Sequence, residues 1–177
     1  MIHRNSKIGE NVEIGNYVVI EEGVEIGDGT VIKNFVELRK NTIIGKNCYI
    51  DSRVSTSGDC VVGDNVTLRY DTILARGCKV GDNTYVCPRV MTNNLNIGKD
   101  QIGGAHIGKN CFIGTNTVFQ HGIKVGDNSP NDFTYFFKVE NLKLLGGDYK
   151  VKVSDKGISH FAHVNKQIEY FIALEAK

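Results

Sequence analysis

The chain has 177 residues, of which 41% are hydrophobic and 23% are charged, values that are ordinary for a soluble globular protein. Its formal net charge of +1 excludes a protein that gathers nucleic acid or an anionic membrane by overall charge. The N-terminal segment lacks the apolar core of a signal peptide, and no run approaches the roughly 18 apolar residues of a membrane-spanning helix. We therefore expect a cytoplasmic protein whose five cysteines are reduced, because they show no CxxC pair and no disulfide-rich spacing.

Residues 2–91 repeat with a period of six, in fifteen blocks without an insertion. The first position is a large aliphatic residue in nearly every block, the fifth is small or β-branched, and the second favours glycine. The fourth position favours Asn, Asp or Gly, which tolerate the left-handed backbone angles of a turn. Three six-residue faces make one triangular coil of 18 residues, so the fifteen blocks predict five stacked coils of a parallel β-solenoid. Four cysteines at the small interior position are expected to be buried: Cys48, Cys60, Cys78 and Cys111.

The blocks IGENVE, IGNYVV, IGDGTV and IGKNCY resemble those of the hexapeptide-repeat acetyltransferases. This resemblance implies an all-β fold, a left-handed parallel β-helix that is usually a homotrimer. It also implies acetyl-CoA as the cosubstrate. The predicted fold is thus a left-handed β-helix over residues 1–129.

The period stops after Met91 and resumes at Ile107, which is not a whole number of blocks after Thr92. We therefore expect residues 92–106 (TNNLNIGKDQIGGAH) to contain a loop that leaves the coil, since solenoids often place insertions on a binding face. The preceding text, CPRVMTNN, resembles a signature of hexapeptide-repeat acetyltransferases that act on nucleotide-linked amino sugars. It has Asn94 where an acid is common, and it lacks the histidine that relatives acting on hydroxyl groups often carry there. The resemblance therefore implies N-acetylation of a nucleotide sugar.

Acetyl transfer to an amine requires a positioned amine, a base and a donor for the developing oxyanion. The candidate catalytic residues are His106, which ends the loop, His121, which we expect to face outward near a corner, and Asn94. Asn93 is a candidate for binding the substrate, and a backbone N–H at a coil corner is a candidate oxyanion donor. The alternative for each of these side chains is an exposed polar residue without a specific function.

Further candidates lie on other blocks of the repeat. Lys109, Lys124 and Thr115 are candidates for binding coenzyme A, the lysines through its phosphates, although most surface lysines have no specific role. Arg69 and Tyr70, in the sequence RYD, are candidates for binding the sugar, or else belong to an intersubunit salt bridge or a solvated surface.

A metalloenzyme of the same fold, the γ-class zinc carbonic anhydrase, requires three histidine ligands from two subunits. His160 and His163 are the one closely spaced pair, and they lie outside the repeat. The sequence therefore predicts no metal site.

Residues 130–177 lack the six-residue period and show strand-like alternation in FTYFFKV, DYKVKVS, ISHFAHV and IEYFIALEA. They predict a small antiparallel β-meander, which is too small to bury a core by itself. This segment resembles the C-terminal end of the DNA polymerase sliding clamps of T4-like phages. The resemblance is carried by Asn131, Phe133, Phe136, Asn141, Lys143, Gly147–Lys150, Lys156–Gly157, Tyr170 and Ala173–Ala176.

Two interpretations of the whole chain follow. In the first it is an acetyl-CoA-dependent N-acetyltransferase, a homotrimer that binds a nucleotide-sugar substrate and neither DNA nor a membrane. In the second it is a truncated or composite solenoid without catalytic activity, because the final coils that usually carry part of the acetyl-CoA groove are replaced by the clamp-like segment. A natural β-cap whose clamp likeness is accidental is the alternative to a composite chain.

Overall fold

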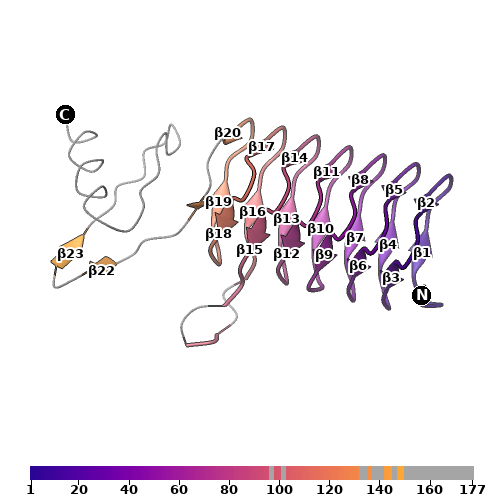
Figure 1. Ribbon diagram of the computed structural model, residues 1–177, viewed down its shortest axis with the longest axis horizontal. Coiled ribbons are helices and arrows are strands. Elements are labelled where there is room, and N and C mark those ends of the chain that lie inside the picture. The colour runs from indigo at the N-terminus through magenta and orange to yellow at the C-terminus, as the bar shows by residue number, and fades with distance from the viewer. Residues whose placement is uncertain (96–97, 101–102, 132–134, 137–141, 145–146, 150–177) are drawn as a thin grey trace. The chain divides into compact units, whose positions relative to one another are not determined.

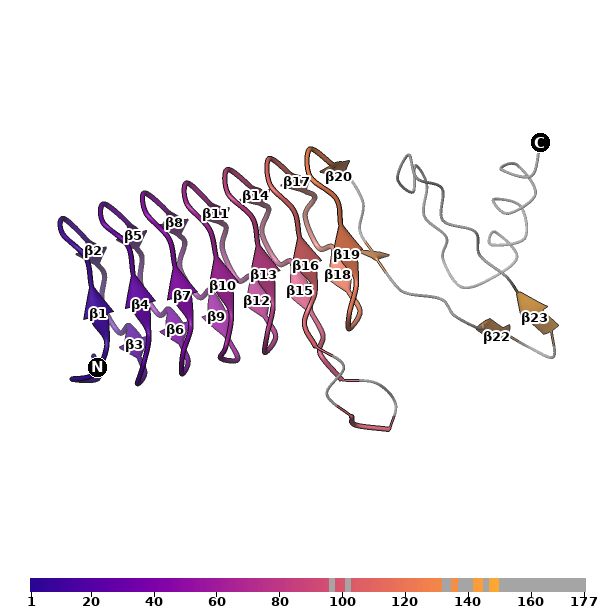
Figure 2. The same cartoon turned by 180° about the vertical axis from the view of Figure 1, so that it is seen from behind.

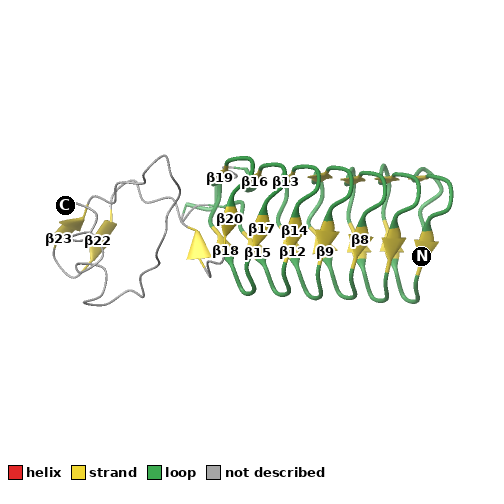
Figure 3. Cartoon of the chain, turned by 90° about the horizontal axis from the view of Figure 1, so that it is seen from above, coloured by secondary structure: helices red, strands yellow, loops and turns green. Residues whose placement is uncertain are grey.

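The computed structural model describes residues 1–95, 98–100, 103–131, 135–136, 142–144 and 147–149. The chain divides into two compact units, Met1–Phe137 and Lys138–Lys177. The first unit is a row of coils, each made of three short strands joined by turns, as Figures 1 and 2 show from opposite sides. No helix occurs among the described residues (Figure 3), and the strands of this unit all pair in parallel. The predicted all-β solenoid is confirmed, and its three-sheet form is consistent with a left-handed β-helix.

Three seven-stranded sheets form the sides of the coils. Sheet 1 consists of β1 (Lys7–Ile8), β4 (Glu25–Ile26), β7 (Ile43–Ile44), β10 (Val61–Val62), β13 (Lys79–Val80), β16 (His106–Ile107) and β19 (Lys124–Val125). Sheet 2 consists of β2 (Glu13–Ile14), β5 (Val31–Ile32), β8 (Tyr49–Ile50), β11 (Thr67–Leu68), β14 (Tyr85–Val86), β17 (Phe112–Ile113) and β20 (Pro130–Asn131). Sheet 3 consists of β3 (Val19–Ile20), β6 (Glu37–Leu38), β9 (Ser55–Thr56), β12 (Ile73–Leu74), β15 (Met91–Thr92), β18 (Val118–Phe119) and β21 (Tyr135–Phe136). The corners are named below by the sheets they join.

The interior of the coils holds the side chains that the six-residue pattern assigns to it. From Ile20 to Phe119 those at the first position are almost fully buried, among them Ile20, Ile32, Leu38, Ile44, Ile50, Leu68 and Leu74, whereas Ile2 and Ile8 of the first coil are exposed. Those at the fifth position are also buried, among them Val24, Val36, Thr30, Thr84 and the four cysteines of the interior prediction. Each large aliphatic side chain removed from water contributes about 1.5–3 kcal/mol, so the ladder of first-position residues is the main source of stability.

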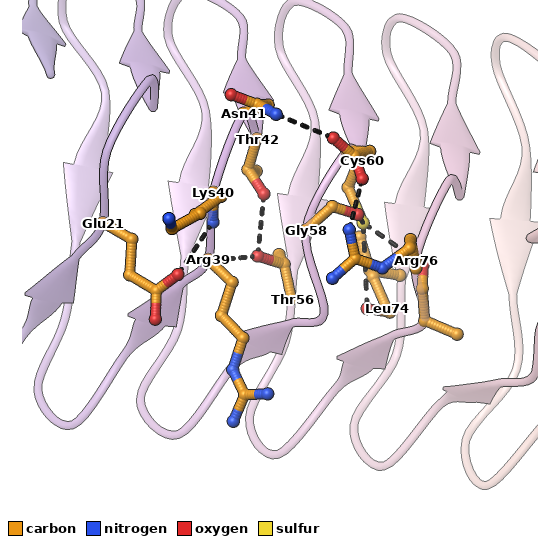
Figure 4. Close-up of polar contacts among 12 residues, drawn as sticks. Glu21, Arg39, Lys40, Asn41, Thr42, Thr56, Gly58, Cys60, Leu74 and Arg76 are labelled. Carbon is orange, nitrogen blue, oxygen red and sulfur yellow. Dashed lines mark hydrogen bonds and ion pairs between the residues drawn. The ribbon is translucent and has the colours of Figure 1, made fainter.

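Polar groups inside the coils find partners inside the coils. The hydroxyl oxygens of Thr42 and Thr56 are 2.9 Å apart, and the Arg39 N–H donates to the Thr56 hydroxyl at 3.1 Å (Figure 4). The thiol of Cys60 lies 3.2 Å from the carbonyl oxygen of Ala75. Hydrogen bonding of this kind removes most of the cost of burying a hydroxyl or a thiol at a corner.

Turn residues adopt the left-handed conformation at the fourth position of the blocks. Many are Asn, Asp or Gly, as the pattern predicts, including Asn11, Gly23, Gly29, Asn41, Asn47, Asp59, Asn65, Asp71, Gly77 and Asn83. Four are not: Tyr17, Phe35, Arg53 and Arg89 also have positive φ. The rings of Tyr17 and Phe35 stack at a centroid separation of 5.1 Å, which offsets part of the backbone cost of a bulky residue in this region.

The second unit is described only in part. Its β22 (Leu142–Leu144) and β23 (Gly147–Tyr149) form an antiparallel pair in which Leu142 faces Tyr149. The predicted strands in ISHFAHV and IEYFIALEA lie outside the described residues. The division of the chain at residues 129 and 130 stays a prediction. Within the described part of the chain, no helix is long and apolar enough to cross a membrane.

Candidate functional site

The inserted loop leaves the solenoid at the 3–1 corner, between β15 and β16. Successive coils are offset by 18 residues up to this point, as in the pairing of Val61 with Lys79. The next pair in sheet 1 joins Lys79 to His106, an offset of 27 residues, so nine extra residues enter this coil. Figures 1 and 2 show the loop projecting from the row of coils beside β15. The predicted loop within residues 92–106 is confirmed.

The start of the loop is fixed by hydrogen bonds to both neighbouring coils. The buried hydroxyl of Thr92 accepts a hydrogen bond from the Ala75 N–H at 2.6 Å. The Asn93 N–H donates to the carbonyl oxygen of Phe119 at 2.8 Å, and the Asn94 N–H donates to Oδ1 of Asn93 at 3.0 Å. Both asparagines therefore leave the coil on a defined backbone, with the Asn93 side chain exposed and Asn94 half-buried.

The loop returns to the coil through two glycines. A Cβ at Gly104 would lie 2.7 Å from Sγ of Cys78, closer than real Cβ contacts allow. The carbonyl oxygen of Gly103 accepts a hydrogen bond from the Gly122 N–H at 3.1 Å. This bond ties the end of the loop to the turn of the following coil, which carries His121.

His121 lies at the same corner, one coil beyond Asn94. Because Thr92 pairs with Phe119, residue 94 is level with residue 121 on the neighbouring rung. The His121 side chain is half-buried rather than fully outward as expected, since the returning loop lies beside its turn. Its Nδ1 is buried, and among the described residues it is the one buried side-chain nitrogen or oxygen without a hydrogen-bond partner. A buried polar atom without a hydrogen bond lowers stability by about 1–3 kcal/mol, so an unpaired nitrogen at this position requires an explanation.

His106 begins β16, on the outer face of sheet 1 beside the loop. Partial burial lowers its pKa, and the positive charges of Lys79 and Lys124 lower it further. Both lysines lie on neighbouring strands in direct register with His106. A lowered pKa favours the neutral imidazole, the form that accepts a proton.

The other predicted residues lie at different corners of this chain. Lys109 forms an ion pair with Asp82 at 2.7 Å at the 1–2 corner. Thr115 is exposed at the 2–3 corner. Lys124 is the one predicted coenzyme-binding residue that lies beside the loop, in register with His106.

Arg69 and Tyr70 also lie at the 2–3 corner. Arg69 Nε donates to Oδ2 of Asp51 at 3.0 Å, and its Nη1 donates to the hydroxyl of Tyr85 at 2.6 Å. The guanidinium of Arg53 lies 5.6 Å from the centre of the Tyr70 ring. In this chain the Asp51–Arg69 contact is an internal ion pair between adjacent coils.

Predicted site residues thus divide into two groups. Asn93, Asn94, His106, His121 and Lys124 lie together around the foot of the loop. Lys79 also belongs there, although no motif marks it in the sequence; the signal that finds it is the 27-residue register across the loop. Arg69, Tyr70, Thr115 and Lys109 lie at the other two corners. Within the described residues, no group of three His, Cys, Asp or Glu side chains is placed to hold a metal ion.

Comparisons with known proteins give two families. Residues 5–40 match the family described as bacterial transferase hexapeptide (six repeats). Residues 87–176, half of the chain, match the family described as gp45 sliding clamp, C terminal. The part of this second match up to Phe136 covers β15 to β21, which pair in parallel as solenoid strands in this structure.

One curated relative is the sliding clamp of Vibrio phage KVP40, 47% identical over 45 residues that cover 25% of this chain and 20% of the clamp. Among solved structures, the Arabidopsis UDP-N-acetylglucosamine acyltransferase has a TM-score of 0.51 and 16% identity, covering 72% of this chain and 54% of that one. PerB from Caulobacter crescentus, in complex with CoA and GDP-perosamine, has a TM-score of 0.45 and 15% identity, covering 84% of this chain and 56% of its own. The chain therefore spans one fifth of the clamp and about half of each of these two solved chains.

Proposed function

This chain belongs to the gp45 sliding clamp C-terminal family, which its residues 87–176 match, and we propose that the hexapeptide-repeat solenoid it carries is an acetyl-CoA-dependent N-acetyltransferase for a nucleotide-linked amino sugar. The observation that carries this proposal is the unpartnered Nδ1 of His121 beside the foot of the inserted loop. A solenoid needs neither feature for its own stability. Together they provide a base at the edge of a loop, where solenoids bind ligands.

In the proposed reaction, acetyl-CoA supplies the acetyl group as a thioester. The imidazole of His121 accepts the proton that the sugar amine loses as it forms the amide bond, and returns a proton to the sulfur that leaves. A backbone N–H at the corner donates to the oxygen on which negative charge develops, and Asn94 orients the amine. Neutral His106, favoured by its lowered pKa, is the second candidate base on the same coil.

The remaining candidates take part through a second subunit. Arg69 and Tyr70 as sugar contacts, and Thr115 and Lys109 as coenzyme contacts, lie at corners away from the loop. We assign them to the copies that a homotrimer would bring against the 3–1 corner. The protein is proposed to be cytoplasmic and to need no metal. DNA is not among the proposed partners, because the net charge is +1 and the match spans one fifth of a clamp.

A second candidate is a composite solenoid, divided near residues 129 and 130, without catalytic activity. It is favoured by the clamp-family match, which begins inside the solenoid and covers the last coils. In that case the coils bind a ligand or serve only as a scaffold.

Calorimetry with acetyl-CoA, followed by assays of acetyl transfer to a panel of nucleotide-linked amino sugars, separates the two candidates. The enzyme is expected to bind acetyl-CoA and to acetylate at least one amino sugar, and His121→Ala is expected to lower kcat by about 10²–10⁴-fold. His3→Ala is the matched control, because Nδ1 of His3 already accepts a hydrogen bond from the Asn5 N–H within its own turn. Absence of binding at millimolar acetyl-CoA would refute the acetyltransferase and favour the composite solenoid without catalytic activity.

A further inference from the structure

Lys79, His106 and Lys124 occupy one outward-facing row at the end of sheet 1. They begin β13, β16 and β19, and the register pairs Lys79 with His106 and His106 with Lys124. Adjacent strands are about 4.8 Å apart, so the three side chains are successive rungs of a ladder. The residue after each one packs into the core, Val80 and Ile107 fully buried and Val125 partly buried, which directs these three outward.

The two lysines of the row differ from several other lysines of the chain, which are paired with carboxylates. Lys7, on the same face of sheet 1, is paired with Glu25, and elsewhere Lys46 pairs with Asp28 and Lys109 with Asp82. Neither Lys79 nor Lys124 forms an ion pair with any residue that the structure describes. The two ammonium groups flank the imidazole and no carboxylate of the described residues pairs with either, so an anion bound between them would gain favourable charge contacts.

The surface beside the row is built from glycines, and the carboxylate of Asp127 lies over one of them, Gly108, where a Cβ would be 2.5 Å from its Oδ1. Two residues after each member stands a glycine: Gly81, Gly108 and Gly126. A Cβ at Gly81 would lie 2.7 Å from the backbone of Gly108, so glycine is required there by close stacking of the coils. The row is consequently bordered by a strip of glycines with the Asp127 carboxylate on one side, and by the foot of the loop on the other.

We propose that Lys79, His106 and Lys124 form a binding site for the phosphate groups of a nucleotide-type ligand. Lysine ammonium groups bind phosphate as point charges, and the imidazole between them donates one hydrogen bond when neutral and two when protonated. In this proposal Lys79 and His106 both bind phosphate. His121 is then the base of the proposed reaction. The nucleotide nature of the ligand rests on the proposed function, whereas binding of the phosphate groups does not.

Inorganic pyrophosphate is the probe that tests the site. It is titrated into the full-length protein at constant ionic strength, while the ring signals of His106 are followed by NMR after assignment with His106→Gln. Saturable movement of these signals is expected, toward the imidazolium form, because an anion beside the ring favours the charged state. Lys79→Gln and Lys124→Gln are each expected to weaken binding about three- to tenfold, the effect of one exposed charge contact.

Lys7→Gln is the matched control, since it removes a lysine from the same face of the same sheet, and pyrophosphate binding is expected to be unchanged. Equal weakening by Lys7→Gln, or signals of His106 that move no further than in sodium chloride of the same ionic strength, would overturn the site. Circular dichroism of the variants establishes that each is folded.

Coenzyme A and UDP identify the source of the phosphates. If coenzyme A competes with pyrophosphate, the site belongs to the cosubstrate; if UDP competes, it belongs to the nucleotide sugar. Competition by neither overturns the assignment to a nucleotide-type ligand. An inactive protein that still binds pyrophosphate through both lysines would refute acetyl transfer and leave the phosphate site standing.

Discussion

At the scale of single residues, replacing His121 is expected to affect the stability of the protein and its proposed activity in opposite directions. Its buried Nδ1 has no partner among the described residues, so replacing the ring by an apolar side chain removes an unsatisfied polar atom. We expect His121→Leu to change the free energy of unfolding by no more than about 1 kcal/mol, or to raise it, while acetyl transfer is lost. Chemical denaturation and turnover assays on the same preparation measure the two effects. A loss of several kcal/mol would mean that the imidazole is a structural element, and would remove the argument for its role as the base.

The second prediction at this scale concerns the charge of His106. Partial burial is the main cause of its lowered pKa, and Lys79 and Lys124 add to it. Removing a neighbouring positive charge favours the imidazolium, so Lys79→Gln is expected to raise the pKa of His106 toward its ordinary value. An NMR titration of the ring signals between pH 4 and 8 measures this, with Lys7→Gln as the control. An unchanged pKa in Lys79→Gln would show that the charge of Lys79 has no part in the lowered value.

At the scale of elements, the glycine at the second position of many blocks leaves no space for a side chain between successive coils. A Cβ at Gly27 would lie 2.6 Å from the carbonyl carbon of Gly45 in the next coil. We expect Gly27→Ala to destabilise the solenoid by about 1–3 kcal/mol, because backbone must move to accept the methyl group. Gly126 is the matched control at the same position of a later coil, where the nearest atom is Oγ of Ser129 at 3.9 Å. Thermal unfolding of the two variants checks the difference, and equal losses would contradict the close-stacking argument.

The same elements show how far the sequence alone predicts this molecule. The six-residue period labels each residue as inward or as part of a turn, so five coils, a buried ladder and the loop at residues 92–106 are all predictable. The period does not say which outward residues become neighbours across the loop. That depends on the nine added residues, which bring Lys79 beside His106. The left-handed turns at Tyr17 and Phe35 are equally invisible to the pattern, because stacking with the adjacent coil offsets their backbone cost.

At the scale of the whole molecule, the residues of the proposed site are divided between corners that one copy of the chain does not bring together. His121 lies at the 3–1 corner, whereas Arg69 lies at the 2–3 corner, held by Asp51 and Tyr85. A cyclic homotrimer places the first corner of one subunit against another corner of its neighbour. The proposal therefore requires a mass of about three times 19.6 kDa in light scattering, and residues from two subunits at each site.

Mixing two inactive variants tests this arrangement directly. His121→Ala and Arg69→Gln are each expected to be inactive alone, the second because it loses a sugar contact. Co-expression gives trimers that contain both variants, and each variant keeps the residue that the other has lost. A site is intact where His121 of an Arg69→Gln subunit meets Arg69 of a neighbouring His121→Ala subunit. Random assembly makes about one site in four intact, so about one quarter of the wild-type activity is expected to return. Activity that stays at the level of the separate variants, in trimers shown to contain both chains, would place His121 and Arg69 in unrelated sites and confine catalysis to the foot of the loop.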